Sequence, residues 1–158
     1  MILLLVLKLV PKNKHKNYII YIKGLEYMRI YITPTTKERP RFNTSTGRAF
    51  TTNKTRDFEE ALKWEYIKNN GKNYGENFIE VELVFSFKPP KSWSKKKINE
   101  ALKGNIRPTK SDIDNYIKAV LDSLNTVAYN DDRYVYKVSS IKKYDTEDYI
   151  EINIKEMK

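Results

Sequence analysis

The chain has 158 residues, 40% hydrophobic and 32% charged, which is enough for one globular domain and too few for two large cores. Its 30 Lys and Arg outnumber 20 Asp and Glu, and the net charge of +10 favours a polyanionic partner such as nucleic acid or an anionic membrane. The lack of cysteine excludes disulfides, cysteine-zinc sites and thiol catalysis. Because there is only one histidine, His15, a metal site would need carboxylate oxygens as ligands.

Residues 1–27 differ from the rest of the chain. The apolar run Met1 to Leu7 is far shorter than the roughly 20 residues that span a bilayer. It also lacks the basic start and the small-residue cleavage site of a signal peptide, so we expect a cytoplasmic protein. A clean strand pattern begins at Met28. We therefore expect an N-terminal extension over 1–27, explained by a start codon assigned too far upstream, and one domain over 28–158.

The first half of this domain predicts a hairpin, a helix and a strand. Residues 41–52 carry the turn signal Asn43 to Gly47 between two short extended runs. Residues 53–70 predict a helix that Gly71 ends. Its apolar side carries Phe58, Ala61, Leu62 and Tyr66. Residues 78–87 alternate strictly between apolar and polar types, which predicts a half-buried strand with Glu80 and Glu82 on its outer face.

The second half predicts helices followed by strands, so that the whole reads as one unit of mixed helix and strand. A short helix is expected over residues 94–102. The strongest helix covers 112–124, with a continuous apolar stripe. The stripe consists of Ile113, Ile117, Val120, Leu121 and Leu124. Residues 133–143 and 149–155 predict two strands joined by a turn at 145–148.

The candidate chemistry gathers at the two ends of the strongest helix. Asp112 and Asp114 flank its start, where the positive end of the helix dipole faces carboxylates, and Lys118 follows Asp114 by one turn. Asp131 and Asp132 lie just beyond the helix, where a reversal of the chain could bring one of them beside Asp112 and Asp114. Three converging carboxylates need a cation, and an all-oxygen set selects Mg2+ or Mn2+. Such an ion can activate water against a phosphodiester.

Each of these residues also has an ordinary structural interpretation. Asp112 could cap the helix, Asp114 and Lys118 could form a surface pair, and the Asp131–Asp132 dipeptide could be a solvated turn. A lone Asp-x-Asp is a weak motif. A Mg2+-dependent nucleotidyl or glycosyl transferase would use the same motif, but the sequence offers no glycine-rich phosphate loop for its nucleotide.

A longer stretch of sequence is more specific than this spacing. Residues 112–125, Asp-Ile-Asp-Asn-Tyr-Ile-Lys-Ala-Val-Leu-Asp-Ser-Leu-Asn, are followed by Val-Ala-Tyr-Asn-Asp-Asp at 127–132. This resembles the signature of RusA-family Holliday junction resolvases, D-x-D-N-L-x-K-A-x-x-D-A-L-N-G with a later Asp pair. Residues 37–42, 47–51 with 54–56, and 90–97 resemble the same family. Together these stretches cover the chain from Met28 onward.

The resemblance implies an α+β subunit with a mixed sheet and two or three helices, assembled as a homodimer with one Mg2+ site per subunit. Mn2+ can substitute. The implied reaction is paired symmetric nicking of branched DNA such as a four-way junction, in recombination and repair, often on prophages. No small-molecule cofactor and no membrane are implied. The family's catalytic residues fall on Asp112, Asp114, Lys118 and Asp132. The three aspartates would be metal ligands, and Asp122 is expected either to orient Lys118 or to cap local structure.

Some positions depart from the family pattern, without removing a proposed ligand. Ser111, Tyr116, Thr126 and Tyr134 replace the usual Pro, Leu, Gly and Gln. The alternative is a relative that binds branched DNA without cleaving it, and the intact aspartates and lysine argue against that alternative.

Two basic groups are candidates for DNA contact. The first surrounds the expected hairpin and consists of Arg39, Arg41, Arg48, Lys54 and Arg56. The second combines charge with a ring and consists of Lys91, Trp93, Lys95, Lys96 and Lys97. The alternatives are ordinary solvated surface for the cations and packing under a loop for Trp93.

Overall fold

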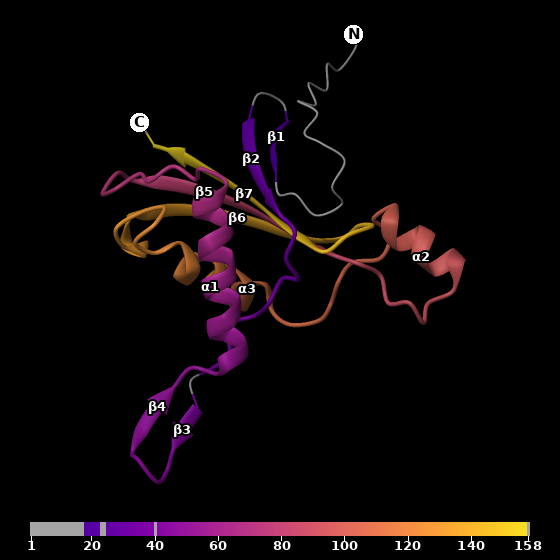
Figure 1. Cartoon of the computed structure of the whole chain (residues 1–158). Coiled ribbons are helices and arrows are strands. Elements are labelled where there is room, and N and C mark those ends of the chain that lie inside the picture. The colour runs from indigo at the N-terminus through magenta and orange to yellow at the C-terminus, as the bar shows by residue number, and fades with distance from the viewer. Residues whose placement is uncertain (1–17, 23–24, 40, 158) are drawn as a thin grey trace.

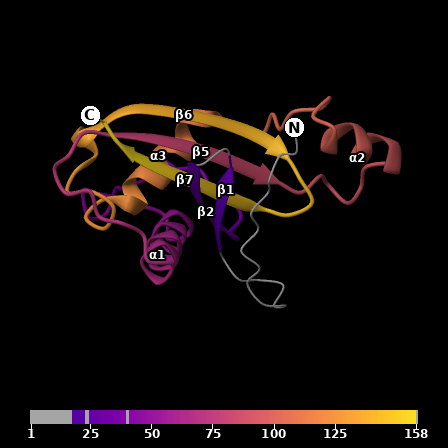
Figure 2. The same cartoon turned by 90° about the horizontal axis from the view of Figure 1, so that it is seen from above.

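The computed structural model describes residues 18–22, 25–39 and 41–157. In this part of the chain, a five-stranded mixed sheet has the order β1-β2-β7-β5-β6, and a separate hairpin pairs β3 with β4 (Figures 1 and 2). The α+β class is therefore confirmed. The elements are β1 (Tyr18–Ile22), β2 (Leu25–Ile30), β3 (Arg41–Asn43), β4 (Arg48–Phe50), α1 (Asn53–Lys68), β5 (Ile79–Phe87), α2 (Lys95–Leu102), α3 (Ile113–Leu124), a 3-10 turn (Asp132–Tyr134), β6 (Val135–Tyr144) and β7 (Tyr149–Glu156).

The sheet is organised around β5, which lies between an antiparallel neighbour, β7, and a parallel neighbour, β6. The last two strands follow each other in the chain but do not pair with each other. Instead, their connecting turn crosses the end of β5. There the Asp145 backbone N–H donates to the Phe87 carbonyl at 3.0 Å, and the Lys88 N–H donates to Asp148 Oδ1 at 2.7 Å.

The N-terminal boundary expected at residue 27 is corrected by the sheet. β1 pairs antiparallel with β2, from Tyr18 opposite Arg29 to Ile22 opposite Leu25. β2 in turn pairs with β7. The apolar patch 18–22 therefore forms an edge strand of the fold, because β2 has an edge that needs a partner. Residues 1–17, including His15, lie outside the described residues.

The core lies between the sheet and one layer formed by α1 and α3 (Figures 1 and 2). The predicted alternation of β5 is confirmed, because its inward side chains are fully or almost fully buried. These are Ile79, Val81, Leu83 and Phe85. On the opposite face of β5, Glu82 accepts hydrogen bonds from Tyr27 Oη at 2.7 Å and Lys155 Nζ at 2.9 Å. That face of the sheet is polar where these three side chains meet.

Both long helices form as predicted, but the side chains that they bury differ in part from the predicted ones. Ala61, expected on the apolar side of α1, is exposed. In α3, Ile113 and Ile117 are only half-buried, whereas Tyr116 is buried against Phe85, with ring centroids 5.4 Å apart. Because α3 contacts α1 as well as the sheet, its buried arc is wider than the aliphatic stripe and is rotated toward Tyr116.

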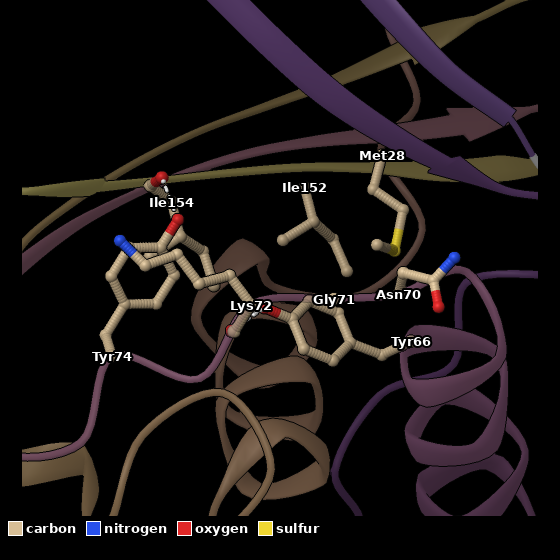
Figure 3. A pocket seen from close by; sticks show the side chains of 8 residues that line it. All are labelled: Met28, Tyr66, Asn70, Gly71, Lys72, Tyr74, Ile152 and Ile154. Atoms are coloured by element: carbon tan, nitrogen blue, oxygen red, sulfur yellow. Dashed lines mark hydrogen bonds between the residues drawn. The ribbon is translucent and has the colours of Figure 1, made fainter.

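A small cavity of about 140 Å³ lies between the C-terminal end of α1 and the sheet (Figure 3). The ring of Tyr66 covers Gly71 there, and its hydroxyl donates to the Lys72 carbonyl at 2.6 Å. A Cβ atom on Gly71 would lie only 2.2 Å from that ring. A glycine is needed at this position because the ring and the backbone approach so closely, and the helix ends where they meet.

We predict that Gly71→Ala lowers the free energy of unfolding by about 1–3 kcal/mol, because the added methyl group overpacks the ring of Tyr66. Urea unfolding followed by circular dichroism measures this loss. In a Tyr66→Leu background the same substitution should cost clearly less, since the obstructing ring is gone. Equal costs in the two backgrounds would show that the ring is not the cause.

Candidate active site

The turn that leads into α3 exposes the two signature aspartates. Ser111 has a left-handed backbone, with φ of +60°, and Asp112 occupies the N-cap position without making a side-chain cap hydrogen bond. Asp112 and Asp114 are both exposed. Within the described residues, neither carboxylate has a hydrogen bond or an ion pair. The helix-cap interpretation of Asp112 therefore fails, and both carboxylates face solvent beside the positive end of the helix dipole.

A cation from a distant strand supports this turn. Lys142 of β6 donates from Nζ to the Ser111 carbonyl at 2.7 Å, and its Nζ lies 5.9 Å from the centre of the Tyr116 ring. The contact holds the residue before Asp112 in its left-handed conformation and places positive charge beside the aspartates. Lys142 could not be predicted as a site residue from the sequence, because no local pattern connects it to Ser111.

Lys118 pairs with Asp122 rather than with Asp114. The distance from Lys118 Nζ to Asp122 Oδ1 is 3.6 Å, while the other oxygen, Oδ2, lies 3.0 Å from Lys37 Nζ. Asp122 is thus shared by two lysines, and the Lys118 side chain remains 62% exposed. The Asp114–Lys118 surface pair is not formed, so Lys118 keeps an accessible ammonium group beside the aspartates.

Lys37 joins the segment before the hairpin to both long helices. Its ammonium group pairs with Glu59 of α1 and with Asp122 of α3, and its backbone N–H donates to the Asn115 carbonyl at 2.9 Å. Burial alone would lower the pKa of Lys37, but the hydrogen bonds to Glu59 and Asp122 outweigh it and raise the pKa. The lysine is therefore charged throughout the neutral range.

The two members of the Asp131–Asp132 pair differ in environment. Asp131 Oδ1 accepts from the Arg133 backbone N–H at 2.9 Å and lies 3.0 Å from Arg133 Nε. These hydrogen bonds lower the pKa of Asp131 to about 2. Asp132 is exposed and has no ion pair within the described part of the chain. Asp131 is thus engaged in the turn, whereas Asp132 remains available as a ligand.

Asp132 does not lie beside Asp112 and Asp114 in one protomer, contrary to our expectation. β6 begins at Val135 beside Ile79, and Ser111 contacts Lys142, which is about 23 Å further along the strand. α3 itself is 12 residues long, or about 18 Å. Among the described residues, no group of three or more Asp, Glu or His side chains could hold a metal ion. The chain does not return Asp132 to the start of α3, because β6 is parallel to β5 and therefore begins at the end of the sheet away from Lys142.

The two basic groups lie at separate places, one around the hairpin that projects from the start of α1 and one around α2 at one end of the sheet (Figure 1). Four hairpin cations are exposed, and they are Arg39, Arg48, Lys54 and Arg56; the side chain of Arg41 lies outside the described residues. The lysines of the second group are also exposed, and they are Lys91, Lys95, Lys96 and Lys97.

The ring of Trp93 packs against other side chains of the same chain. Its ring packs edge-on against Tyr144 at 5.4 Å, and Lys97 Nζ lies 4.1 Å from the ring centre. These contacts support the interpretation of Trp93 as a packing residue. In the described part of the chain, no helix combines the length and apolarity needed to cross a bilayer.

Comparison with known proteins adds two findings. Residues 32–155 match the family model described as "Endodeoxyribonuclease RusA". The chain is also similar to "Uncharacterized protein YqaN" of Bacillus subtilis (strain 168), with 46% identity over 65 residues. That alignment covers 40% of this chain and 46% of the relative, so the chain spans less than half of that protein. The family match includes the start of α3, Lys118 and the Asp131–Asp132 pair.

We predict that Lys37→Met lowers the free energy of unfolding by about 1–3 kcal/mol, because Glu59 and Asp122 lose their shared cation in a half-buried site. Lys54→Met is the matched control; it removes an exposed ammonium group that has no ion pair with any described residue, and it should change stability by less than about 0.5 kcal/mol. Equal losses in the two variants would contradict the role of the Lys37 network.

The pH dependence gives this prediction a second readout. The folded-state pKa of Lys37 lies above the unfolded value of about 10.4, so its contribution is complete below that pH. The contribution is lost as the pH rises through the higher folded-state pKa. The stability gap between wild type and Lys37→Met should therefore be constant from about pH 7 to 9 and narrow in stronger alkali.

Proposed function

The chain belongs to the RusA endodeoxyribonuclease family, and we propose that it is a Mg2+-dependent endonuclease that resolves four-way (Holliday) junctions by paired symmetric nicks. One observation carries this proposal. Among the described residues, the exposed Asp112 and Asp114 have no partner at the start of α3, and the accessible ammonium group of Lys118 lies one turn further on.

The donor set fits Mg2+, and Mn2+ would replace it, because all the candidate ligands are carboxylate oxygens. Asp112 and Asp114 would hold the ion together with Asp132 of a second protomer. When bound, the ion would polarise the scissile phosphate and make a water molecule more acidic. Lys118 would place its positive charge where the phosphate gains negative charge, and Asp122 would orient it from the next turn.

The charge distribution supports branched DNA as the substrate. The hairpin and α2, around which the basic groups lie, project from different parts of the molecule (Figure 1). Cations at separate places can contact the phosphates of different arms. Because such contacts release counterions, affinity for DNA should fall steeply with salt.

A homodimer explains how the third carboxylate would reach the other two. β6 is an edge strand of the sheet, and much of its side-chain surface is exposed. Tyr136 is 72% and Ile141 is 55% exposed, and the nearby Phe78 is 58% exposed. A ten-residue edge with apolar side chains is a template for pairing with another strand.

Antiparallel pairing of two β6 edges would bring Asp132 of one protomer toward Asp112 and Asp114 of the other. If the twofold axis passed through Val138, Val135 of the partner subunit would pair with Ile141, next to Lys142, and the 3-10 turn that carries Asp132 would lie just beyond this pair. Lys142 contacts Ser111, which precedes Asp112. In this arrangement each dimer would have two equivalent composite sites, with Asp112, Asp114 and Lys118 from one protomer and Asp132 from the other.

We predict that wild-type protein nicks a synthetic four-way junction with labelled arms at symmetric positions in Mg2+ and not in EDTA. Asp114→Asn should lower the cleavage rate by at least about 100-fold, because a metal ligand loses its charge. Asp57→Asn, at an exposed carboxylate of α1, is the matched control and should cleave like wild type. Tight junction binding with no nicks under any divalent metal would instead indicate a binding protein that does not cleave.

We also predict that two inactive variants complement each other. In a dimer of Asp114→Asn with Asp132→Asn, both substitutions would fall in one composite site, and the other site would be intact. Random exchange between equal amounts of the variants should therefore restore about a quarter of the wild-type sites, which would nick one strand at a time. A mixture as inactive as each variant alone would reject shared sites.

A further inference from the structure

The hairpin of β3 and β4 projects from the end of α1, away from the sheet (Figure 1). Its strands pair antiparallel, from Arg41 opposite Phe50 to Asn43 opposite Arg48. Residues 42–49 are all exposed. Such a two-stranded ribbon has dimensions that fit a groove or an opening in nucleic acid.

The tip of this hairpin is a defined turn. Asn43 Oδ1 accepts from the backbone N–H groups of Ser45 at 2.9 Å and Thr46 at 3.2 Å. Gly47 has φ of +66°, and its N–H donates to the Asn43 carbonyl at 2.8 Å. Because the turn has its own hydrogen bonds, the strands beside it are held in register and can present a side chain in a fixed direction.

Phe42 is a large apolar side chain that this hairpin exposes. It is 65% exposed, and the residue directly opposite, Ala49, is too small to cover a ring. A single exposed apolar residue needs no special explanation by itself. Its surroundings are informative, because Arg39, Arg48 and Lys54 are exposed and have no carboxylate partner within the described residues.

The base of the hairpin is attached to the candidate active site. Lys37 contacts the first turn of α3 through the Asn115 carbonyl, and the Glu38 N–H donates to Thr55 Oγ1 at 3.4 Å. Phe42 is five residues from Lys37 and therefore lies at most about 17 Å from this attachment. At about 3.4 Å per nucleotide along a strand, that is about five nucleotide steps.

We propose that the hairpin inserts Phe42 as a stacking wedge at the branch point of the DNA, against a base that has lost its neighbour. This inference rests on the proposed junction endonuclease activity and deepens it. Stacking is interrupted where arms meet, so a ring inserted there displaces less base stacking than a ring inserted into a duplex. Cations around the ring match a polyanion, and they would oppose the docking of a second basic chain.

The test uses full-length protein with Asp114→Asn, so that the DNA stays intact, and a four-way junction with 2-aminopurine at the branch point. A linear duplex with the sequence of one arm is the comparison. Phe42→Ala should weaken junction binding by about ten-fold or more, the size expected for one lost base–aromatic stack, and should abolish the 2-aminopurine change. Duplex binding should stay within about two-fold, because the phosphate contacts remain. Phe42→Trp should restore both readouts.

Trp64→Ala is the matched control, since it removes another ring of similar exposure, 68%, from α1. It should leave junction binding and the 2-aminopurine signal unchanged. Phe42→Ala that binds junctions as tightly as its parent, with the same signal, would overturn the wedge even if wild type cleaves junctions. Dissociation of the Phe42→Ala dimer in sedimentation would also overturn it, by placing the ring in a protein interface. A 2-aminopurine signal that depends on Phe42, in a protein that cleaves no junction, would support the stacking wedge and contradict the proposed endonuclease activity.

Discussion

The parallel pairing of β6 with β5 determines where the candidate catalytic groups lie. A strand parallel to its neighbour must be entered from the same end, so the chain leaves β5, passes through α2 and α3, and returns before it begins β6. α3 consequently runs back along the sheet in the direction opposite to β6. Its start is beside Lys142, near the end of β6, while Asp132 precedes the beginning of that strand. The two halves of the acidic set are separated by the length of the crossover.

A second constraint acts at the other side of α3. Asp122 binds Lys118, which is proposed to face DNA, and Lys37, which holds the base of the hairpin. One half-buried carboxylate thus connects the proposed phosphate-binding cation with the arm that projects toward the substrate. Glu59 adds α1 to the same network. The hairpin, α1 and α3 are therefore joined at a point adjacent to the signature aspartates, and a shift in one of them is resisted by the others.

Patterns confined to one element could be predicted from the sequence, and contacts between distant elements could not. The periodicity of residues 53–70 and 112–124 predicted α1 and α3, and the alternation of 78–87 predicted the buried face of β5. The family signature selected the aspartates without knowledge of the fold. The Lys142–Ser111 contact depends on how β6 lies beside α3, which no local pattern encodes. Because the strand order could not be predicted either, a chain reversal that brings Asp132 beside Asp112 was a reasonable expectation.

Other differences also arise from tertiary packing. Tyr116 is buried because α3 packs against both the sheet and α1, whereas an amphipathic stripe accounts for one neighbour only. Ala61 is exposed, and its apolar character alone does not require burial, because apolar atoms also contribute much of a protein's surface. β1 joins the sheet because β2 offers an open edge, a property of the assembled sheet that residues 18–22 do not reveal alone.

The distance between Asp132 and Asp112 would also affect the enzyme at low abundance. If each site takes carboxylates from two protomers, an isolated copy holds two incomplete halves and hydrolyses nothing. Below the dissociation constant of the dimer, the concentration of complete sites would then grow with the square of the protein concentration. The activity of such a nuclease would then respond more steeply than its concentration to a change in the rate of synthesis.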